Sequence, residues 1–198
     1  MLSVSGMFKL IVIGTSLGGL HALQVLLNLL PKSFPVPVAI VQHRHKGSDE
    51  ILRALLQNYS RLIVKETQDK EDILPGFVYL APANYHLLVE DGGIAPCPHF
   101  ALSIDDPVTY ARPSIDVLFE TAADVYAQKV IGVLLTGANY DGVQGMTRIK
   151  ARGGKTLVED PSTAFCPIMP EAAITAGVVD KILPLVGIAD FLVKICQF

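Results

Sequence analysis

The stretch Lys9-Leu10-Ile11-Val12-Ile13-Gly14-Thr15-Ser16-Leu17-Gly18-Gly19 decides the fold. Its four consecutive apolar residues, 10–13, are rich in β-branched Ile and Val and predict a strand buried on both faces. Glycines then bracket Ser16 in a G-x-S-x-G pattern, and residues 20–30 continue with leucines at helical spacing. We therefore expect a buried strand, a sharp turn that carries Ser16, and a helix.

Two interpretations of the Ser16 turn stand side by side. A serine on such a turn is held out of the sheet, and the helix start beyond it offers free N–H groups for an oxyanion. A glycine-rich turn between a strand and a helix is also a common phosphate cradle. This turn lacks the G-x-G-x-x-G spacing and the Gly-Lys-Ser/Thr ending of a P-loop. The pattern alone leaves both a nucleophile and a structural or anion-binding turn open.

Length and composition narrow the class of protein. The 198 residues suffice for one sizeable core and are few for two, so we expect a single domain over residues 1–198. Every apolar run breaks before the ~18 residues that span a bilayer, and residues 1–6 lack signal-peptide features, so we expect no membrane insertion. The net charge of −3, without a basic block, argues against nucleic acid as a partner. We expect no cofactor and no metal.

The three cysteines, Cys97, Cys166 and Cys196, are odd in number and widely spaced, with no Cys-x-x-Cys. This pattern is typical of reduced thiols in a cytoplasmic protein. We expect the three thiols to be buried.

Strands and helices alternate at the start of the chain. Apolar strands are predicted at 9–13, 36–42 and 62–64, with a helix at 20–30 and a second after Ser48, its expected N-cap. The core face of this second helix is predicted to consist of Ile51, Leu52, Leu55 and Leu56. The resulting βαβαβ order implies a parallel sheet with right-handed crossovers.

The middle of the chain differs. Residues 75–105 contain short strand-like runs separated by turn signals, and we predict that these strands are antiparallel and inserted beside the sheet. The αβ alternation then returns with a helix capped by Ser114, a strand at 130–135 and further elements to residue 195. We predict an α/β fold, a three-layer α/β/α arrangement with a mostly parallel, doubly wound sheet and a short antiparallel insertion.

Three residues of complementary chemistry follow the three most apolar strands. Ser16, His43 and Asp141 should fall at the carboxyl edge of the sheet, where open α/β sheets bind ligands. Serine, histidine and aspartate are the residue types of nucleophilic acyl transfer, in which histidine takes the serine proton and the carboxylate fixes its tautomer. Their order along the chain, Ser-His-Asp, argues against the α/β-hydrolase fold, whose order is Ser-Asp-His.

Each partner also has a structural interpretation. His43 could simply end its strand, and His45 or His86 could take its place as the base. Asp141 could be only a helix N-cap before the glycine that follows. His21, on the first helix, is expected to be exposed or packed rather than catalytic.

With these motifs in hand, the chain resembles the catalytic domain of the chemotaxis protein-glutamate methylesterases, from about residue 9 to 185. The resemblance is carried by Gly14-Thr15-Ser16-Leu17-Gly18-Gly19, Val41-Gln42-His43, Tyr79-Leu80-Ala81-Pro82, Arg112-Pro113-Ser114-Ile115-Asp116, Leu135-Thr136-Gly137, Asp141-Gly142-Val143-Gln144-Gly145-Met146 and Pro170-Glu171-Ala172-Ala173. Each motif is weak by itself, and the ordered set is highly specific. In that family the serine, histidine and aspartate at the positions of Ser16, His43 and Asp141 form the catalytic triad.

The resemblance implies a serine carboxyl-ester hydrolase that demethylates γ-glutamyl methyl esters of chemoreceptors or related signalling proteins, and that can deamidate receptor glutamines. We expect the N–H of Leu17 as an oxyanion donor and the Gly137-Ala138 loop as the source of a second. Arg112 is expected to form part of the site wall. The alternatives are a weak or inactive family member that serves as a signalling binding module, and an α/β protein that binds a phosphorylated small molecule at the Ser16 turn.

The chain departs from the family pattern in three respects. Leu17 stands where the family often has Thr, and Ala138-Asn139 where it often has Met-Gly. Members usually carry an amino-terminal receiver domain, whereas here fewer than ten residues precede the first predicted strand. We therefore expect no receiver domain in this chain, which would be either a stand-alone member or an excised domain.

Overall fold

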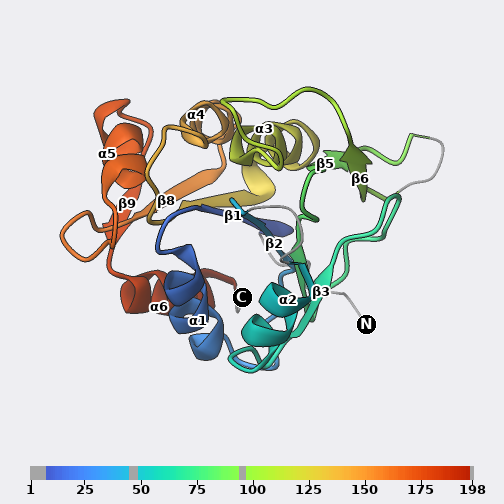
Figure 1. The fold of residues 1–198 in the computed structure, drawn as a ribbon, viewed down its shortest axis with the longest axis horizontal. Helices are drawn as coiled ribbons and strands as arrows, with labels where there is room; N and C mark the ends of the chain where they lie inside the picture. Colours follow the sequence, from blue (N-terminus) through green and yellow to red (C-terminus); the bar gives the residue numbers. More distant parts are fainter. Residues whose placement is uncertain (1–7, 45–48, 94–96, 197–198) are drawn as a thin grey trace.

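The computed structural model of the protein describes residues 8–44, 49–93 and 97–196 (Figure 1). Its centre is a seven-stranded sheet in the order β3-β4-β2-β1-β7-β8-β9, in which every neighbouring pair is parallel. These strands are β1 (Leu10–Thr15), β2 (Val38–Gln42), β3 (Ile63–Glu66), β4 (Phe77–Leu80), β7 (Val130–Leu134), β8 (Lys155–Glu159) and β9 (Lys181–Leu183).

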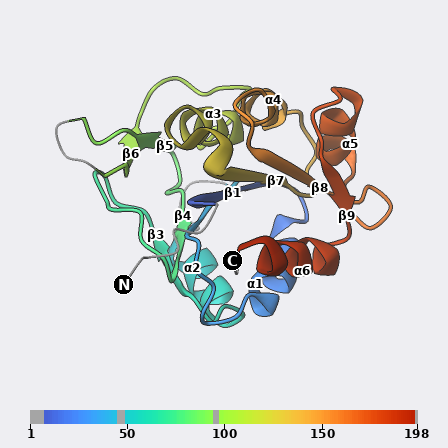
Figure 2. The same cartoon turned by 180° about the vertical axis from the view of Figure 1, so that it is seen from behind.

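Helices cover both faces of the sheet (Figures 1 and 2). One face carries α1 (Gly19–Leu29), α2 (Asp49–Gln57) and α6 (Leu185–Cys196). The other carries α3 (Ile115–Tyr126), α4 (Val143–Ala151) and α5 (Ile168–Thr175), with the 3₁₀ helix η1 (Ala127–Lys129) after α3. A separate antiparallel pair, β5 (His86–Glu90) and β6 (His99–Ser103), lies beside α3. The predicted three-layer, doubly wound α/β fold with an antiparallel insertion is confirmed.

The strand β1 shows why the opening stretch decides the fold. Ile11 and Ile13 point into the core under α1, α2 and α6, whereas Leu10 and Val12 point into the core under α3 and α4. Alternate side chains of a strand face opposite sides of a sheet, so an apolar run without interruption fits only a strand covered on both faces. All four side chains are fully buried.

The prediction that all strands of residues 75–105 are inserted and antiparallel is wrong for β4. This strand lies inside the main sheet, parallel to β2 on one side and to β3 on the other. Val78 and Leu80 enter one core and Tyr79 enters the other, which is the two-sided burial of a central parallel strand. The prediction holds for β5 and β6, whose register pairs His86 with Ser103.

Some local predictions also need correction. Leu52 and Leu56 of α2 are buried as expected, but Ile51 and Leu55 are exposed, so the apolar face of this helix is narrower. The predicted cap Ser48 lies outside the described residues.

The three cysteines carry free thiols and differ in burial. Cys196 is buried, while Cys166 is half-buried and Cys97 is exposed, so the expectation of three buried thiols is wrong for the last two.

The register of three central strands brings the candidate residues to one edge. Thr15 of β1 is level with Gln42 of β2, and Gly14 is level with Leu134 of β7. The residues that follow β1, β2 and β7 therefore leave the sheet at the same carboxyl edge. The chain continues from β1 into α1 on one face and from β7 towards α4 on the other, which opens a crevice between them.

Within the described residues, no helix has the length and apolar character needed to cross a membrane.

Candidate active site

The turn that carries Ser16 is fixed by Thr136, which follows β7. The Ser16 N–H donates to the Thr136 carbonyl oxygen at 3.0 Å, and the Thr15 hydroxyl donates to the same oxygen at 2.9 Å. The Thr136 hydroxyl lies 2.9 Å from the Leu17 carbonyl oxygen. Gly18 has φ +83°, and a Cβ there would lie 2.6 Å from Cβ of Phe165. Hydrogen bonds and packing therefore hold the backbone of the Ser16 turn in one conformation.

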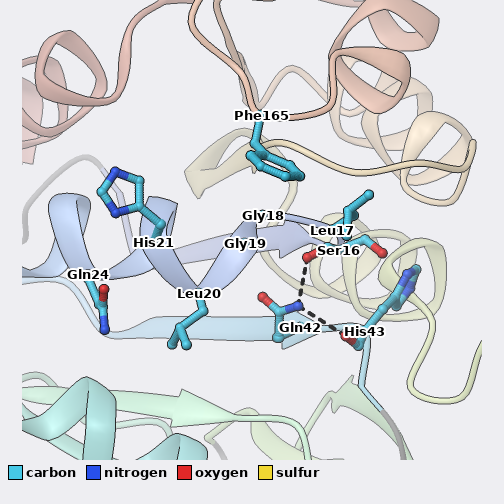
Figure 3. A pocket seen from close by; sticks show the side chains of 10 residues that line it. All are labelled: Ser16, Leu17, Gly18, Gly19, Leu20, His21, Gln24, Gln42, His43 and Phe165. Carbon is cyan, nitrogen blue, oxygen red and sulfur yellow. Dashed lines mark hydrogen bonds between the residues drawn. The ribbon is translucent and has the colours of Figure 1, made fainter.

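Gln42 joins the serine turn to the histidine turn. Its side-chain Nε2 donates to the carbonyl oxygen of Ser16 at 2.9 Å and to that of His43 at 3.0 Å (Figure 3). A Cβ on Gly19 would lie 2.3 Å from Oε1 of this glutamine, so only glycine admits the close approach. One amide thus sets the spacing between two loops that come from neighbouring strands.

His43 directly follows β2 and is positioned by both its backbone and its ring. Its N–H donates to the Thr15 carbonyl oxygen at 3.0 Å. Its Nε2 lies 2.8 Å from Oδ2 of Asp141, and its side chain is 13% exposed while that of the aspartate is fully buried. This close contact brings together an imidazole and a buried carboxylate, two of the three side chains named from the sequence.

Asp141 lies in the loop before α4, and its carboxylate reaches the N-terminus of α3, where it accepts four hydrogen bonds from the described residues. Besides His43, the donors are the N–H groups of Ile115 at 2.7 Å and Asp116 at 2.9 Å, and the Ser114 hydroxyl at 2.9 Å. Burial alone would raise the pKa of this carboxyl, yet the bonds from His43 and the helix N–H groups hold it below its ordinary value. Asp141 is therefore a stable anion that can orient an imidazole and stabilise its protonated form.

Ser114 has a second role as the N-cap of α3, confirming the predicted cap. Its side-chain oxygen accepts a bond from the Val117 N–H at 3.5 Å while its hydroxyl proton goes to Asp141. The cap residue therefore links the start of α3 to the carboxylate of Asp141.

Asp116 lies behind this pair, where its Oδ1 accepts the Gly145 N–H at 2.8 Å. Burial raises its pKa to about 7, and the negative charges of Asp141 and Glu120 act in the same direction. Two neighbouring carboxyl groups therefore have opposite environments: one is held as an anion and the other retains its proton to near neutrality.

Ser16 and His43 line the same two cavities but are not joined. One cavity, of about 620 Å³, is bordered by Leu17, Leu20 and Phe165 (Figure 3). The other, of about 500 Å³, lies on the side of Tyr110 and Arg112. In the described part of the chain the Ser16 hydroxyl has no hydrogen-bond partner, so the serine–imidazole half of the predicted relay is not formed. Catalytic hydrogen bonds are often long or misaligned in empty sites and tighten with substrate.

The side chain of Asn139 contacts Nδ1 of His43, the ring nitrogen that remains for the serine hydroxyl because Nε2 faces Asp141. Its side-chain Nδ2 lies 3.1 Å from Nδ1 of His43, and its Oδ1 lies 3.3 Å from the Asp141 backbone nitrogen. In the sequence, this residue stands out only as a departure from the family pattern.

The candidate oxyanion donors divide into two groups. Among the described residues, the N–H groups of Leu17 and Ala138 have no hydrogen-bond partner and are available to a ligand. The Gly137 N–H is already used, since it donates to the Cys166 carbonyl oxygen at 3.0 Å. Gly137 instead allows Met169 to pack closely against the loop, because a Cβ at this position would lie 1.8 Å from Sδ of Met169.

Arg112 lies in the wall of the smaller cavity and ties its loop in place. Its guanidinium donates to the carbonyl oxygens of Ile104 and Asp105 at 2.6 and 2.9 Å and to Oδ1 of Asn84 at 2.8 Å. This arginine therefore contributes shape and positive charge to the site.

The other histidines named from the sequence have different positions. His86 is buried, its Nδ1 accepts the Ser114 N–H at 3.2 Å, and its Nε2 lies 3.1 Å from the Asp106 carbonyl oxygen, so it supports the scaffold. His21 is exposed and lines the larger cavity away from Asp141. His45 lies outside the described residues. Across the described ranges, no group of three or more His, Cys, Asp or Glu side chains could hold a metal ion.

Sequence reasoning missed three side chains of this site: the Ser114 hydroxyl as a partner of Asp141, the Gln42 amide and the Asn139 amide. Gln42 and Ser114 lie inside motifs that carried the family resemblance, at residues 41–43 and 112–116. Their place in these motifs was a signal that could have identified them as site residues. No pattern in the sequence pointed to Asn139 as a partner of the imidazole.

The chain is similar to known proteins over most of its length. The sequence model of the CheB methylesterase family matches residues 11–192. A Leptospira interrogans protein, provisionally named protein-glutamate methylesterase/protein-glutamine glutaminase, is 46% identical over 190 residues, covering 96% of each chain. A Thermotoga maritima protein named for the same two activities is 37% identical over 195 residues, covering 98% of this chain and 55% of that relative.

A solved structure resembles the whole described fold. The CheB methylesterase catalytic domain of Thermotoga maritima has a TM-score of 0.91 and 38% sequence identity, covering 96% of this chain and 99% of that one.

Proposed function

The chain belongs to the CheB methylesterase family, and from this premise we propose that it hydrolyses γ-glutamyl methyl esters of a protein substrate to glutamate and methanol. The hydrogen bond between His43 Nε2 and Asp141 Oδ2, beside Ser16 in a shared cavity, is the observation that carries the chemistry. Ser16 is assigned as nucleophile, His43 as general base and acid, and Asp141 as the carboxylate that orients it.

The first half of the reaction forms an acyl-enzyme. Because Nε2 of His43 faces Asp141, the nitrogen that takes the Ser16 proton is Nδ1. The freed Ser16 oxygen attacks the ester carbonyl carbon, and the carbonyl oxygen becomes an oxyanion that the N–H groups of Leu17 and Ala138 are available to bind. Collapse of the tetrahedral intermediate breaks the bond to the methoxy oxygen, and methanol leaves with the proton from Nδ1.

The second half restores the enzyme. Water gives a proton to Nδ1 of His43 and attacks the acyl carbon, and the Ser16 oxygen leaves with that proton. The product is a γ-carboxylate, which loses its own proton to solvent. A glutamine side chain reacts by the same steps with ammonia as the leaving group, so protein-glutamine deamidation belongs to the same proposal, as the names of the relatives also support.

The binding-module alternative is less favoured. A protein that only binds a partner does not require a buried carboxylate that three donors at 2.7–2.9 Å hold against one imidazole. The phosphate-cradle alternative is also weaker, since the Ser16 N–H is already bound to Thr136.

The proposed partner is a methylated chemoreceptor or a related signalling protein, in the cytoplasm. The family membership supports the partner, and the pattern of widely spaced cysteines without Cys-x-x-Cys favours the location.

Methanol release from methylated receptor membranes tests this function. The unmodified protein should release methanol, and Ser16→Ala should lower kcat by several powers of ten, as is typical of losing a nucleophile. Ser33→Ala is a matched control, since this serine is exposed and lies outside the site. Equal rates for the unmodified protein and Ser16→Ala would exclude Ser16 as the nucleophile.

A serine-directed fluorophosphonate gives a second readout that needs no receptor. Mass spectrometry should find the adduct on Ser16, and absence of an adduct there would favour the anion-binding alternative.

A further inference from the structure

Asn139 contacts the candidate base directly, and its orientation follows from its neighbours. The backbone N–H of Asp141 can only donate, so the side-chain atom of Asn139 that faces it, at 3.3 Å, is the acceptor Oδ1. The amide nitrogen Nδ2 is therefore the atom that lies 3.1 Å from Nδ1 of His43. The two contacts are consistent with only one orientation of this amide.

The amide orientation determines the tautomer of the imidazole. An amide NH₂ is only a donor, so Nδ1 of His43 must be the unprotonated, accepting nitrogen. The ring proton then resides on Nε2, which faces the ionised Asp141 at 2.8 Å. Asn139 and Asp141 thus select the same tautomer from opposite sides of the ring.

This arrangement places Asn139 in competition with the nucleophile. Nδ1 carries a single lone pair in the plane of the ring, and Asn139 uses it in the empty site. Ser16 lines the same cavity as both residues, and its hydroxyl has no partner within the described residues. The serine can pass its proton to His43 only after the amide has withdrawn.

Proton transfer also makes the contact unfavourable. Once Nδ1 has taken a proton, two donors face each other, and the amide has to turn away. The loop allows this movement, because Asn139 is half-buried between the exposed residues Ala138 and Tyr140, and within the described residues its side chain makes one other hydrogen bond, a long one of 3.3 Å.

We propose that Asn139 is a positioning residue that holds His43 in its reactive tautomer while covering the basic nitrogen Nδ1, and that it releases this nitrogen when substrate enters. This inference rests on the proposed function of Ser16 and His43.

The rate of Ser16 labelling by a small fluorophosphonate tests the inference, because this probe needs no receptor contacts. Asn139→Ala removes the competing donor, and the second-order labelling rate should rise roughly two- to tenfold, as expected for losing one net hydrogen bond from the ground state. Asn58→Ala, at an exposed asparagine outside the site, should label at the unmodified rate.

A second variant separates this role from a structural one. Asn139→Asp has nearly the same shape but turns an acceptor towards Nδ1, which favours a proton there and removes the lone pair. Its labelling rate at pH 7 should fall at least tenfold and recover as the pH rises. A residue that only filled space would tolerate this change. Equal labelling of the unmodified protein and Asn139→Asp would overturn the proposal.

Nitrogen-15 NMR of the imidazole gives an independent check. The unmodified protein should show Nδ1 without a proton and Nε2 with one; the reversed tautomer would contradict the inference. So would a labelling rate of Asn139→Ala equal to or below that of the unmodified protein. These failures differ from failure of the proposed function, in which Ser16 acquires no adduct in any variant.

Discussion

The carboxylate of Asp141 lies 2.8 Å from Nε2 of His43, although 98 positions separate the two residues in the chain. The register of β1 with β2 and β7 brings their loops together, and the N-terminus of α3 supplies the donors that hold the carboxylate. The acidity of this group is therefore a property of the tertiary structure. It follows that substitutions in the scaffold should alter catalysis as well as stability.

Asp141→Asn should lower kcat by about four powers of ten, the effect known for this substitution in Ser-His-Asp triads. The amide presents an NH₂ to neighbours that are themselves donors, which disturbs the orientation of His43. Steady-state methanol release measures the loss, and circular dichroism checks that the fold persists. A kcat within threefold of the unmodified protein would show that the carboxylate is not needed.

Ser114→Ala should lower the free energy of unfolding by about 1 kcal/mol, because it removes the N-cap of α3. It also removes one of the four bonds to Asp141, so kcat should fall as well, by less than for Asp141→Asn. Urea denaturation and methanol release measure the two effects. Ser33→Ala, at an exposed serine, should change neither quantity.

Gln42→Met keeps the length of the side chain and removes the donor that joins the Ser16 and His43 turns. We expect kcat to fall by roughly ten- to a hundredfold with little change in KM, since small displacements of reacting groups have effects of this size. Gln128→Met, at an exposed position, is the matched control. A change in KM alone would show that this glutamine binds substrate rather than positions the turns.

Gly137→Ala should destabilise the protein by about 1–3 kcal/mol, because the new methyl group would overlap Sδ of Met169 and force the loop after β7 to shift. Gly187→Ala, within α6, meets neighbours at 3.4 Å or more and should be neutral or stabilising. Thermal unfolding compares the two variants. Equal melting temperatures would contradict the close packing at Gly137.

Asp116→Asn should change how stability depends on pH. Burial raises the pKa of Asp116 from 3.8 to about 7, so the folded protein retains a proton that the unfolded chain loses between these values. The contribution of this group to stability is therefore present at low pH and is lost as the pH rises towards 7. The unmodified protein should lose stability more steeply than the variant across this window.

Urea denaturation at several pH values measures the difference between the two proteins. Both share every other ionisable group, so the difference isolates this carboxyl. Parallel curves would show that it is ionised throughout.

Local patterns predicted much of the fold. The apolar run of β1, the glycines around Ser16 and the cap at Ser114 act over a few residues, and each led to an element that the structure contains. The placement of β4 was mistaken because its neighbours in the sheet are determined by pairing with strands far along the chain. The breadth of the α2 core face was mistaken because burial depends on what packs against a helix.

The amino-acid sequence by itself determined the alternation of strands and helices, the family of the chain and the three residue types brought to one edge of the sheet. Hydrophobic periodicity and glycine position determine local structure over a few residues, so strands, helices and turns can be predicted from them without a structure. Only the tertiary structure decided that Asp141 is held by the start of α3, that Nδ1 of His43 faces the cavity, and that Asn139 covers it. These are contacts between side chains from separate loops, and their geometry depends on strand register and packing rather than on any local pattern.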